Sequence, residues 1–302
     1  MEEIFRKQVE LLIRCLPEVQ KQNCFALKGG TAVNLFIRDM PRLSVDIDLV
    51  YIPIEPRAET LTNIEDALSK MANDIESSIH GSTITKLSKQ NHINKLFIEH
   101  DGVTVKIEPN IVQRGLIFET EEKFLCESAE IEFEASVTAT TIAEAELYGS
   151  KITAALDRQH PRDLFDVKLL LENEGITDDI RKSLIVYLAS HPRPINELLN
   201  PNLKNIEQEF RTQFQGMSNK PVELTELLTA REILIHQINN ELTENERRFL
   251  LSVKIGEPDY SLIDTPNIEK LPAIQWKLQN ITKMEKLKHQ DAVEELRKVL
   301  NL

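Results

Sequence analysis

Two aspartates separated by one residue, Asp46 and Asp48, are the feature of this sequence best suited to chemistry. They lie within an apolar run, residues 43–52, that predicts a β-strand with the pair in its middle. Because strand side chains alternate, both carboxylates point to one face, while Ile47 and Leu49 point to the other. Two like charges this close are costly unless a cation lies between them, and hard oxygen ligands suit Mg²⁺ or Mn²⁺. Taken alone, the pattern fits two solvent-facing acids on an edge strand better than it fits a metal site.

A glycine turn ahead of the aspartates strengthens the interpretation as a metal site. Gly29 and Gly30 follow the apolar segment 24–27, which predicts a buried strand, and precede residues 31–37, which predict a helix. Backbone N–H groups at a helix start, with no Cβ in the way, can bind a phosphate, and Thr31 adds a hydroxyl. Such a turn, followed by a strand with two aspartates, predicts that a triphosphate lies beside metal ligands.

A third carboxylate is expected on a neighbouring strand. In residues 103–108 apolar and polar residues alternate, so that Thr104, Lys106 and Glu108 share one face. Glu108 is therefore predicted to complete a two-metal site and to accept the proton of an attacking hydroxyl group. The alternative is a surface glutamate paired with Lys106.

Cations for a polyphosphate are predicted in the second half of the chain. Lys151 and Arg158 are seven residues apart in the predicted helix 144–159, so they share a face and can neutralise triphosphate charge. Asp163 follows Pro161 at the start of the next predicted helix, where it is expected to cap that helix. A salt bridge from Asp163 to Arg158 is compatible with a role in the site. Solvated surface cations are the alternative for the basic pair.

The elements that position these residues indicate two domains. Residues 1–140 mix predicted helices with predicted strands, and residues 141–302 are predicted to be mainly helical. Residues 1–22 predict the first helix, and Pro17 is expected to disturb its end. A proline-interrupted stretch at 191–221 is the best candidate for a hinge or subdomain joint. The predicted fold class is α+β.

Composition limits the classes of function. The chain has 302 residues, 41% hydrophobic and 28% charged, the balance of a soluble globular protein. Its net charge of −13 should repel nucleic-acid backbones, so an RNA substrate would have to be gripped through a local basic patch. A small-molecule substrate or a basic protein partner also suits this charge. Aromatic residues make up only 5%, and no stacking platform for single-stranded nucleic acid is evident.

The cysteines and the apolar runs indicate the compartment. Cys15, Cys24 and Cys126 are widely spaced and form no zinc-binding pattern, which indicates reduced thiols. No apolar run approaches the roughly 20 residues of a membrane span, and the acidic N-terminus does not resemble a signal peptide. We therefore expect a cytoplasmic protein with no membrane partner.

In their order along the chain, these motifs resemble those of the nucleotidyltransferase AbiEii/AbiGii toxin family, a branch of the DNA polymerase β-like superfamily. Residues 27–48 resemble the first family motif, and residues 106–108 resemble the second. Residues 151–158 and 161–166 resemble the third and fourth motifs, and the run 271–280 is also similar to family members. The resemblance covers most of the chain.

The resemblance implies a polymerase β-like mixed sheet with helices, followed by a mainly helical lobe. It also implies Mg²⁺-dependent transfer of a nucleotide from an NTP. Several members are toxins of type IV toxin–antitoxin or abortive-infection systems, and some add nucleotides to the 3′ end of tRNA. The partners implied are thus NTP, an RNA acceptor such as tRNA, and a cognate antitoxin protein.

By the same resemblance, Asp46 and Asp48 hold the metals, and Asp163 is a site acid or orients Lys151. Glu108 is predicted as the third metal ligand from its place on the strand. The residues expected to bind the substrate are Gly29, Gly30, Thr31, Ser44, Lys151 and Arg158. Of these, Gly30, Thr31 and Lys151 are also implied by the resemblance.

Two departures from the family pattern leave the choice of acceptor open. The spacer between Thr31 and Asp46 is slightly longer than the common range, and Glu rather than Asp stands at position 108. One alternative is a transferase that adds AMP or another nucleotide to a protein, and another is an inactive binding partner of the same fold. A phosphatase with Asp46 as nucleophile would leave the glycine turn unexplained.

Overall fold

The computed structural model describes residues 2–89 and 91–302, and it divides into two compact units. Unit 1 comprises Met1–Leu147 and Gln215–Pro221, and unit 2 comprises Tyr148–Phe214 and Val222–Leu302. The proline-interrupted stretch 191–221 thus contains the point at which the chain returns to unit 1.

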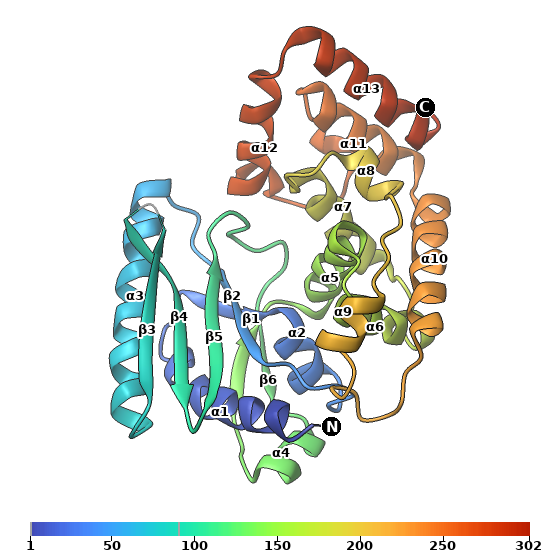
Figure 1. Ribbon diagram of the computed structural model, residues 1–302. Coiled ribbons are helices and arrows are strands. Elements are labelled where there is room, and N and C mark those ends of the chain that lie inside the picture. The colour runs from blue at the N-terminus through green and yellow to red at the C-terminus, as the bar shows by residue number, and fades with distance from the viewer. Residues whose placement is uncertain (1, 90) are drawn as a thin grey trace. The chain divides into compact units, whose positions relative to one another are not determined.

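Unit 1 is built on a seven-stranded mixed sheet with the strand order β3-β4-β5-β2-β1-β7-β6 (Figure 1). At its centre, β2 pairs in parallel with β5 and antiparallel with β1. A mixed sheet in unit 1 and a helical unit 2 confirm the predicted α+β class. The strands are β1 (Phe25–Lys28), β2 (Asp46–Tyr51), β3 (Thr83–Lys89), β4 (His92–His100), β5 (Val103–Asn110), β6 (Glu121–Phe124) and β7 (Thr138–Thr141).

Helices α1 (Glu3–Gln20) and α3 (Arg57–Ser78) pack against each other, and they contact β5 and β4 respectively. The alternation in β5 divides the sheet into a core face and an outer face. Val105 and Ile107 are fully buried, whereas Lys106 and Glu108 are partly exposed. Unit 1 also contains α2 (Gly29–Ala32), the π-helix Val33–Ile37 and α4 (Glu127–Phe133).

Helix α1 confirms most of the predicted helix 1–22, and Pro17 does not interrupt it. The helix does not end there but continues to Gln20 with Pro17 inside it. Proline removes one backbone hydrogen bond from a helix. Leu12, Leu16 and Val19 are almost completely buried on one side of α1, so that tertiary packing offsets the missing bond.

The strand with the two aspartates is shorter at its start than the predicted strand 43–52. Strand β2 begins at Asp46 rather than at residue 43, so the pair lies at the start of the strand and not in its middle. The preceding residues pair elsewhere, because Leu43 N–H donates to the carbonyl oxygen of Met217 (2.9 Å) and Arg42 forms a bridge with Ser218.

Unit 2 is helical. Helix α6 contacts α10, helix α7 contacts α11 and α12, and α11 contacts α13. None of the helices in the described residues is long and apolar enough to cross a membrane. The helices are α5 (Glu144–Arg158, which begins in unit 1), α6 (Pro161–Glu172), α7 (Asp178–Ser190), α8 (Ile195–Leu199), α9 (Glu207–Gln213), α10 (Leu224–Glu241), α11 (Glu244–Ile255), α12 (Pro272–Thr282) and α13 (Lys286–Leu300).

Candidate active site

The central strands bring the three predicted carboxylates to one face of the sheet. In the parallel pairing of β2 with β5, Asp48 is registered with Glu108 and Asp46 with Lys106. Ile47 is buried on the opposite face. The alternation predicted for both strands is therefore confirmed, and it gathers the acids of two segments that lie far apart in the sequence.

Two lysines neutralise Glu108. The Nζ atoms of Lys95 and Lys106 each lie 3.0 Å from a carboxylate oxygen of Glu108, and Lys106 Nζ is also 3.9 Å from Asp46 Oδ1. Burial acts to raise the pKa of Glu108, but hydrogen bonds from Lys95 and Lys106 outweigh it and hold the pKa below its ordinary value. Burial acts to lower the pKa of Lys106, whereas Asp46 and Glu108 raise it above the ordinary value. Glu108 is therefore ionised, and it has the lysine partner that its sequence context suggested.

The glycine turn lies against the carboxylates. Gly29 has a φ of +73°, and a Cβ placed on it would be 2.5 Å from Asp48 Oδ2. A Cβ on Gly30 would be 2.8 Å from a guanidinium nitrogen of Arg42 and 2.8 Å from Ser44 Oγ. Both glycines are therefore required by close approach of other groups, and Gly29 also by its left-handed backbone.

Thr31 and Ser44 connect this turn to the start of β2. The buried Thr31 hydroxyl donates to the carbonyl oxygen of Asp46 (2.6 Å) and lies 3.1 Å from Ser44 Oγ. Both side chains were predicted to bind the substrate. The structure shows in addition that Thr31 positions the backbone of Asp46, a role that the sequence pattern did not reveal.

We call the three carboxylates Asp46, Asp48 and Glu108 the carboxylate strip. Their ligand atoms suit a divalent cation. Asp46, Asp48 and Glu108 supply only hard oxygen atoms, and the ammonium group of Lys106 already stands beside two of these carboxylates as a positive charge. Within residues 2–89 and 91–302, no three or more His, Cys, Asp or Glu side chains are gathered closely enough to hold a metal ion. For the three carboxylates to share an ion, their side chains and Lys106 must rotate.

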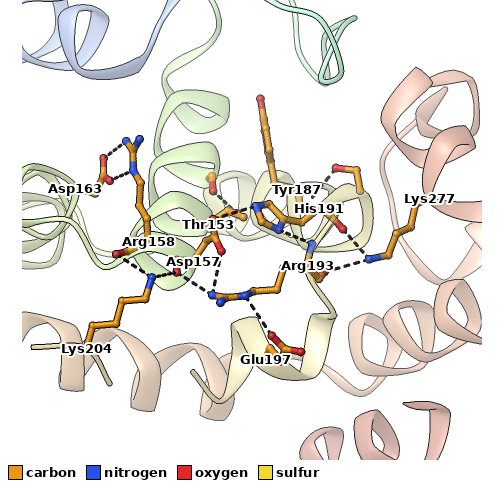
Figure 2. Close-up of polar contacts among 12 residues, drawn as sticks. Thr153, Asp157, Arg158, Asp163, Tyr187, His191, Arg193, Glu197, Lys204 and Lys277 are labelled. Atoms are coloured by element: carbon orange, nitrogen blue, oxygen red, sulfur yellow. Dashed lines mark hydrogen bonds and ion pairs between the residues drawn. The ribbon is translucent and has the colours of Figure 1, made fainter. Parts of the chain in front are cut away.

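In unit 2, Lys151 is buried between two aspartates of α6. Its Nζ atom lies 3.1 Å from Asp163 Oδ1 and 3.0 Å from Asp166 Oδ2. Asp163 also accepts hydrogen bonds from Arg158, with Nη2 at 2.9 Å (Figure 2). Burial acts to raise the pKa of Asp163, but the charges of Lys151 and Arg158 outweigh it and hold the pKa well below its ordinary value.

The start of α6 corrects the role expected for Asp163. The capping residue is His160, whose Nδ1 accepts from Arg162 N–H (3.2 Å). Asp163 lies inside the first turn, where the two cations of α5 engage its carboxylate. Asp166 was not among the predicted site residues, although its position three residues after Asp163 places it on the same helix face.

The last turn of α5, which carries Arg158, is held by further cations (Figure 2). Lys204 Nζ donates to the carbonyl oxygens of Asp157 (3.1 Å) and Arg158 (3.4 Å). Arg193 donates to the Asp157 carbonyl oxygen (2.9 Å) and lies 3.0 Å from Asp157 Oδ1. These groups satisfy carbonyls that a helix end leaves without intrahelical partners and complement the helix dipole. The backbone from which Arg158 reaches Asp163 is thereby fixed.

Comparison with known proteins assigns this chain to a family. The sequence profile of the family described as nucleotidyl transferase AbiEii toxin, type IV toxin–antitoxin system, matches residues 10–280. Among solved structures, the fold is similar to that of MenT4, a nucleotidyltransferase toxin from Mycobacterium tuberculosis H37Rv. The TM-score is 0.62 at 16% sequence identity, over 92% of this chain and 93% of that chain. No curated protein matches the sequence.

The likeness to MenT4 confirms the fold, and the family match spans most of the chain. This protein belongs to the nucleotidyl transferase AbiEii toxin family of type IV toxin–antitoxin systems and is a nucleotidyltransferase.

Proposed function

We propose that this protein transfers a nucleotide from an NTP to the 3′ end of an RNA, in particular a tRNA, in a reaction that requires Mg²⁺. The observation that carries the proposal is the register of β2 with β5, which aligns Asp48 with Glu108 on the face against which Gly29 is packed. Membership of the family supports the class of reaction, and the carboxylate strip supports the dependence on a metal.

In the proposed reaction, the 3′-hydroxyl oxygen of the RNA forms a bond to the α-phosphorus of the NTP. The bond from that phosphorus to the oxygen bridging to the β-phosphate breaks, and pyrophosphate leaves. Asp46, Asp48 and Glu108 would hold Mg²⁺, which offsets negative charge on the triphosphate. The turn at Gly29 and Gly30 would offer backbone N–H groups to the phosphates without a Cβ in the way.

Glu108 is also the proposed acceptor of the hydroxyl proton, because its lysine partners keep it ionised. A lowered pKa makes a carboxylate a weaker base. Glu108 is therefore expected to contribute more as a ligand than as a base.

Lys151 and Arg158 are the proposed cations for the triphosphate. They differ in access to solvent, because the Arg158 side chain is 60% exposed and that of Lys151 only 6%. Arg158 is accordingly the more accessible contact for a phosphate, and Asp163 orients both cations.

The proposal is tested by incubating the protein with each α-³²P-labelled NTP, Mg²⁺, and either total RNA or total protein from bacteria. We expect label in RNA near its 3′ end, and no label with Asp48→Asn. Asp101→Asn is the matched control, because that aspartate lies in an exposed hairpin. Label in protein would favour the alternative acceptor, and the absence of label from both fractions would contradict the proposal.

The toxin role is tested in growing bacteria. We expect induction of the wild-type chain to arrest growth and induction of Asp48→Asn to leave growth unaffected, with the cognate antitoxin restoring growth to the wild type. Equal growth arrest by the wild type and by Asp48→Asn would show that toxicity does not depend on nucleotide transfer.

A further inference from the structure

The outer face of α12 carries an exposed aromatic ring beside exposed amide and ammonium groups. Trp276 is the only tryptophan in the sequence, and the residue is 51% exposed. At helical spacing from it lie Gln279, Asn280 and Lys283, all exposed. An aromatic ring, two amides and a cation therefore share one stripe in which no acid occurs.

The opposite side of α12 fixes this stripe in place. Ala273, Ile274 and Ile281 are buried there. Lys277, the neighbour of Trp276, is also buried, and its ammonium donates to the carbonyl oxygens of His191 (2.7 Å) and Arg193 (3.1 Å), just beyond the end of α7 (Figure 2). These contacts set the rotation of α12, so Trp276 cannot turn inward without breaking them.

The local charge is opposite to that of the whole chain. Residues 271–290 contain four lysines and one glutamate, whereas the chain carries a net charge of −13. Of these lysines, Lys277 is buried and Lys288 pairs with Glu285 (3.9 Å), which leaves two for the surface. Lys283 and Lys286 are both exposed, and in the described part of the chain neither forms an ion pair. We call Trp276, Gln279, Asn280 and Lys283, together with Lys286 at the start of α13, the Trp276 face.

We propose that the Trp276 face docks the single-stranded end of the RNA acceptor, an inference that rests on RNA being the acceptor in the proposed function. The indole ring offers a surface on which a base stacks, and the two amides match the hydrogen-bonding edges of an unpaired base. The two lysines attract phosphates, which an acidic chain otherwise repels. A basic protein partner would meet the wrong charge here.

The fluorescence of Trp276 allows RNA binding to be measured on the wild-type protein. Because Trp276 is the sole tryptophan, its emission reports on this face alone. We expect bulk tRNA, added without NTP and in the presence of EDTA, to quench the emission in a saturable and salt-sensitive way. Unchanged emission would overturn the inference.

Variants assign the contribution of each group, measured by anisotropy with fluorescein-labelled bulk tRNA. Trp276→Ala should weaken binding roughly tenfold, and Trp276→Phe should retain most of it because the ring can still stack. The pair K283E/K286E should weaken binding by about tenfold or more and reduce the slope of log affinity against log salt by about 1.4. Melting temperatures should match the wild type, since these side chains are exposed.

The matched control is K86E/K89E, which makes the same change of charge on the exposed strand β3. Equal weakening by both pairs would overturn the docking surface. If K283E/K286E transfers label to RNA as fast as the wild type, the surface is wrong and the proposed function stands. If tRNA quenches Trp276 but label enters only protein, the surface stands and the proposed acceptor is wrong.

Discussion

The two groups of charged residues in this protein differ in how far solvent reaches them. In unit 1 the side chains of Asp46 and Glu108 are 32% and 34% exposed, whereas in unit 2 those of Lys151, Asp163 and Asp166 are at most 6% exposed. Exposed ion pairs contribute little to stability, so replacing one partner of such a pair costs little free energy. Breaking a buried pair leaves a charge without compensation. The carboxylates of unit 1 are therefore suited to exchange a lysine partner for a metal ion. The buried cluster of unit 2 is suited to hold its side chains in a fixed arrangement.

Asp48→Asn should have the largest effect on function and a small effect on stability. We expect nucleotide transfer to fall by at least about a thousandfold, because a lost metal ligand removes several kcal/mol of transition-state stabilisation. The free energy of unfolding should change by less than about 1 kcal/mol, since this part of the sheet is partly exposed. Transfer rates and urea unfolding measure the two effects, and a large loss of stability would remove the contrast with unit 2.

Lys151→Met should have the largest effect on stability. It leaves Asp163 and Asp166 buried without their shared ammonium, so the free energy of unfolding should fall by about 3–5 kcal/mol in urea unfolding. Lys168→Met is the matched control, because Lys168 also pairs with two carboxylates but nearer the solvent, and it should cost about 1 kcal/mol or less. Equal costs for the two variants would mean that burial is not the distinguishing property.

Gly29→Ala should impair transfer through Asp48. The new Cβ would lie 2.5 Å from the Asp48 carboxylate and displace it, and a misplacement of this kind costs roughly 10- to 100-fold in rate. Gly102→Ala separates this effect from backbone strain, because Gly102 has a φ of +75° but no atom within 4 Å of the added Cβ. Both variants should lose about 1–2 kcal/mol of stability, while only Gly29→Ala should lose activity.

Burial of Asp163 predicts a weaker effect, on the stability of the fold at acid pH. The pKa of folded Asp163 lies below the ordinary value of 3.8, so its pairing stabilises the fold fully above that value. This contribution is lost as the pH falls toward the folded pKa, because the unfolded chain then binds more protons. Between pH 5 and pH 3 the melting temperature of the wild type should fall more steeply than that of Asp163→Asn. Parallel curves would show that Asp163 is not preferentially ionised in the fold.

Much of the carboxylate strip could be predicted from the sequence, because alternation within a strand depends on local residues alone. The shared face of Thr104, Lys106 and Glu108 was predicted in this way, and so was the shared face of Asp46 and Asp48. The order of strands is set by tertiary pairing instead. Consequently neither the register of Asp48 with Glu108 nor the contact from Lys95 could be predicted.

Three short elements could not be predicted, because their local sequence carries too little information. Strands β6 and β7 have four residues each and α8 has five, too few for a hydrophobic period to show. The apolar run 43–52 predicts too early a start for β2, because residues 42–43 pair with a segment more than a hundred residues further on. Aspartate is a common cap, which predicts Asp163 as the cap of α6, whereas the buried Lys151 and the more exposed Arg158 both bind its carboxylate.

The most direct test of the carboxylate strip is calorimetric titration of the protein with a non-transferable NTP analogue, in Mg²⁺ and in EDTA. If the strip holds metal together with nucleotide, the wild type should bind the analogue in Mg²⁺ and at least about tenfold more weakly in EDTA. In the variant D46N/D48N the two conditions should give the same weak binding. Binding by that variant with an undiminished Mg²⁺ dependence would show that the metal is held elsewhere.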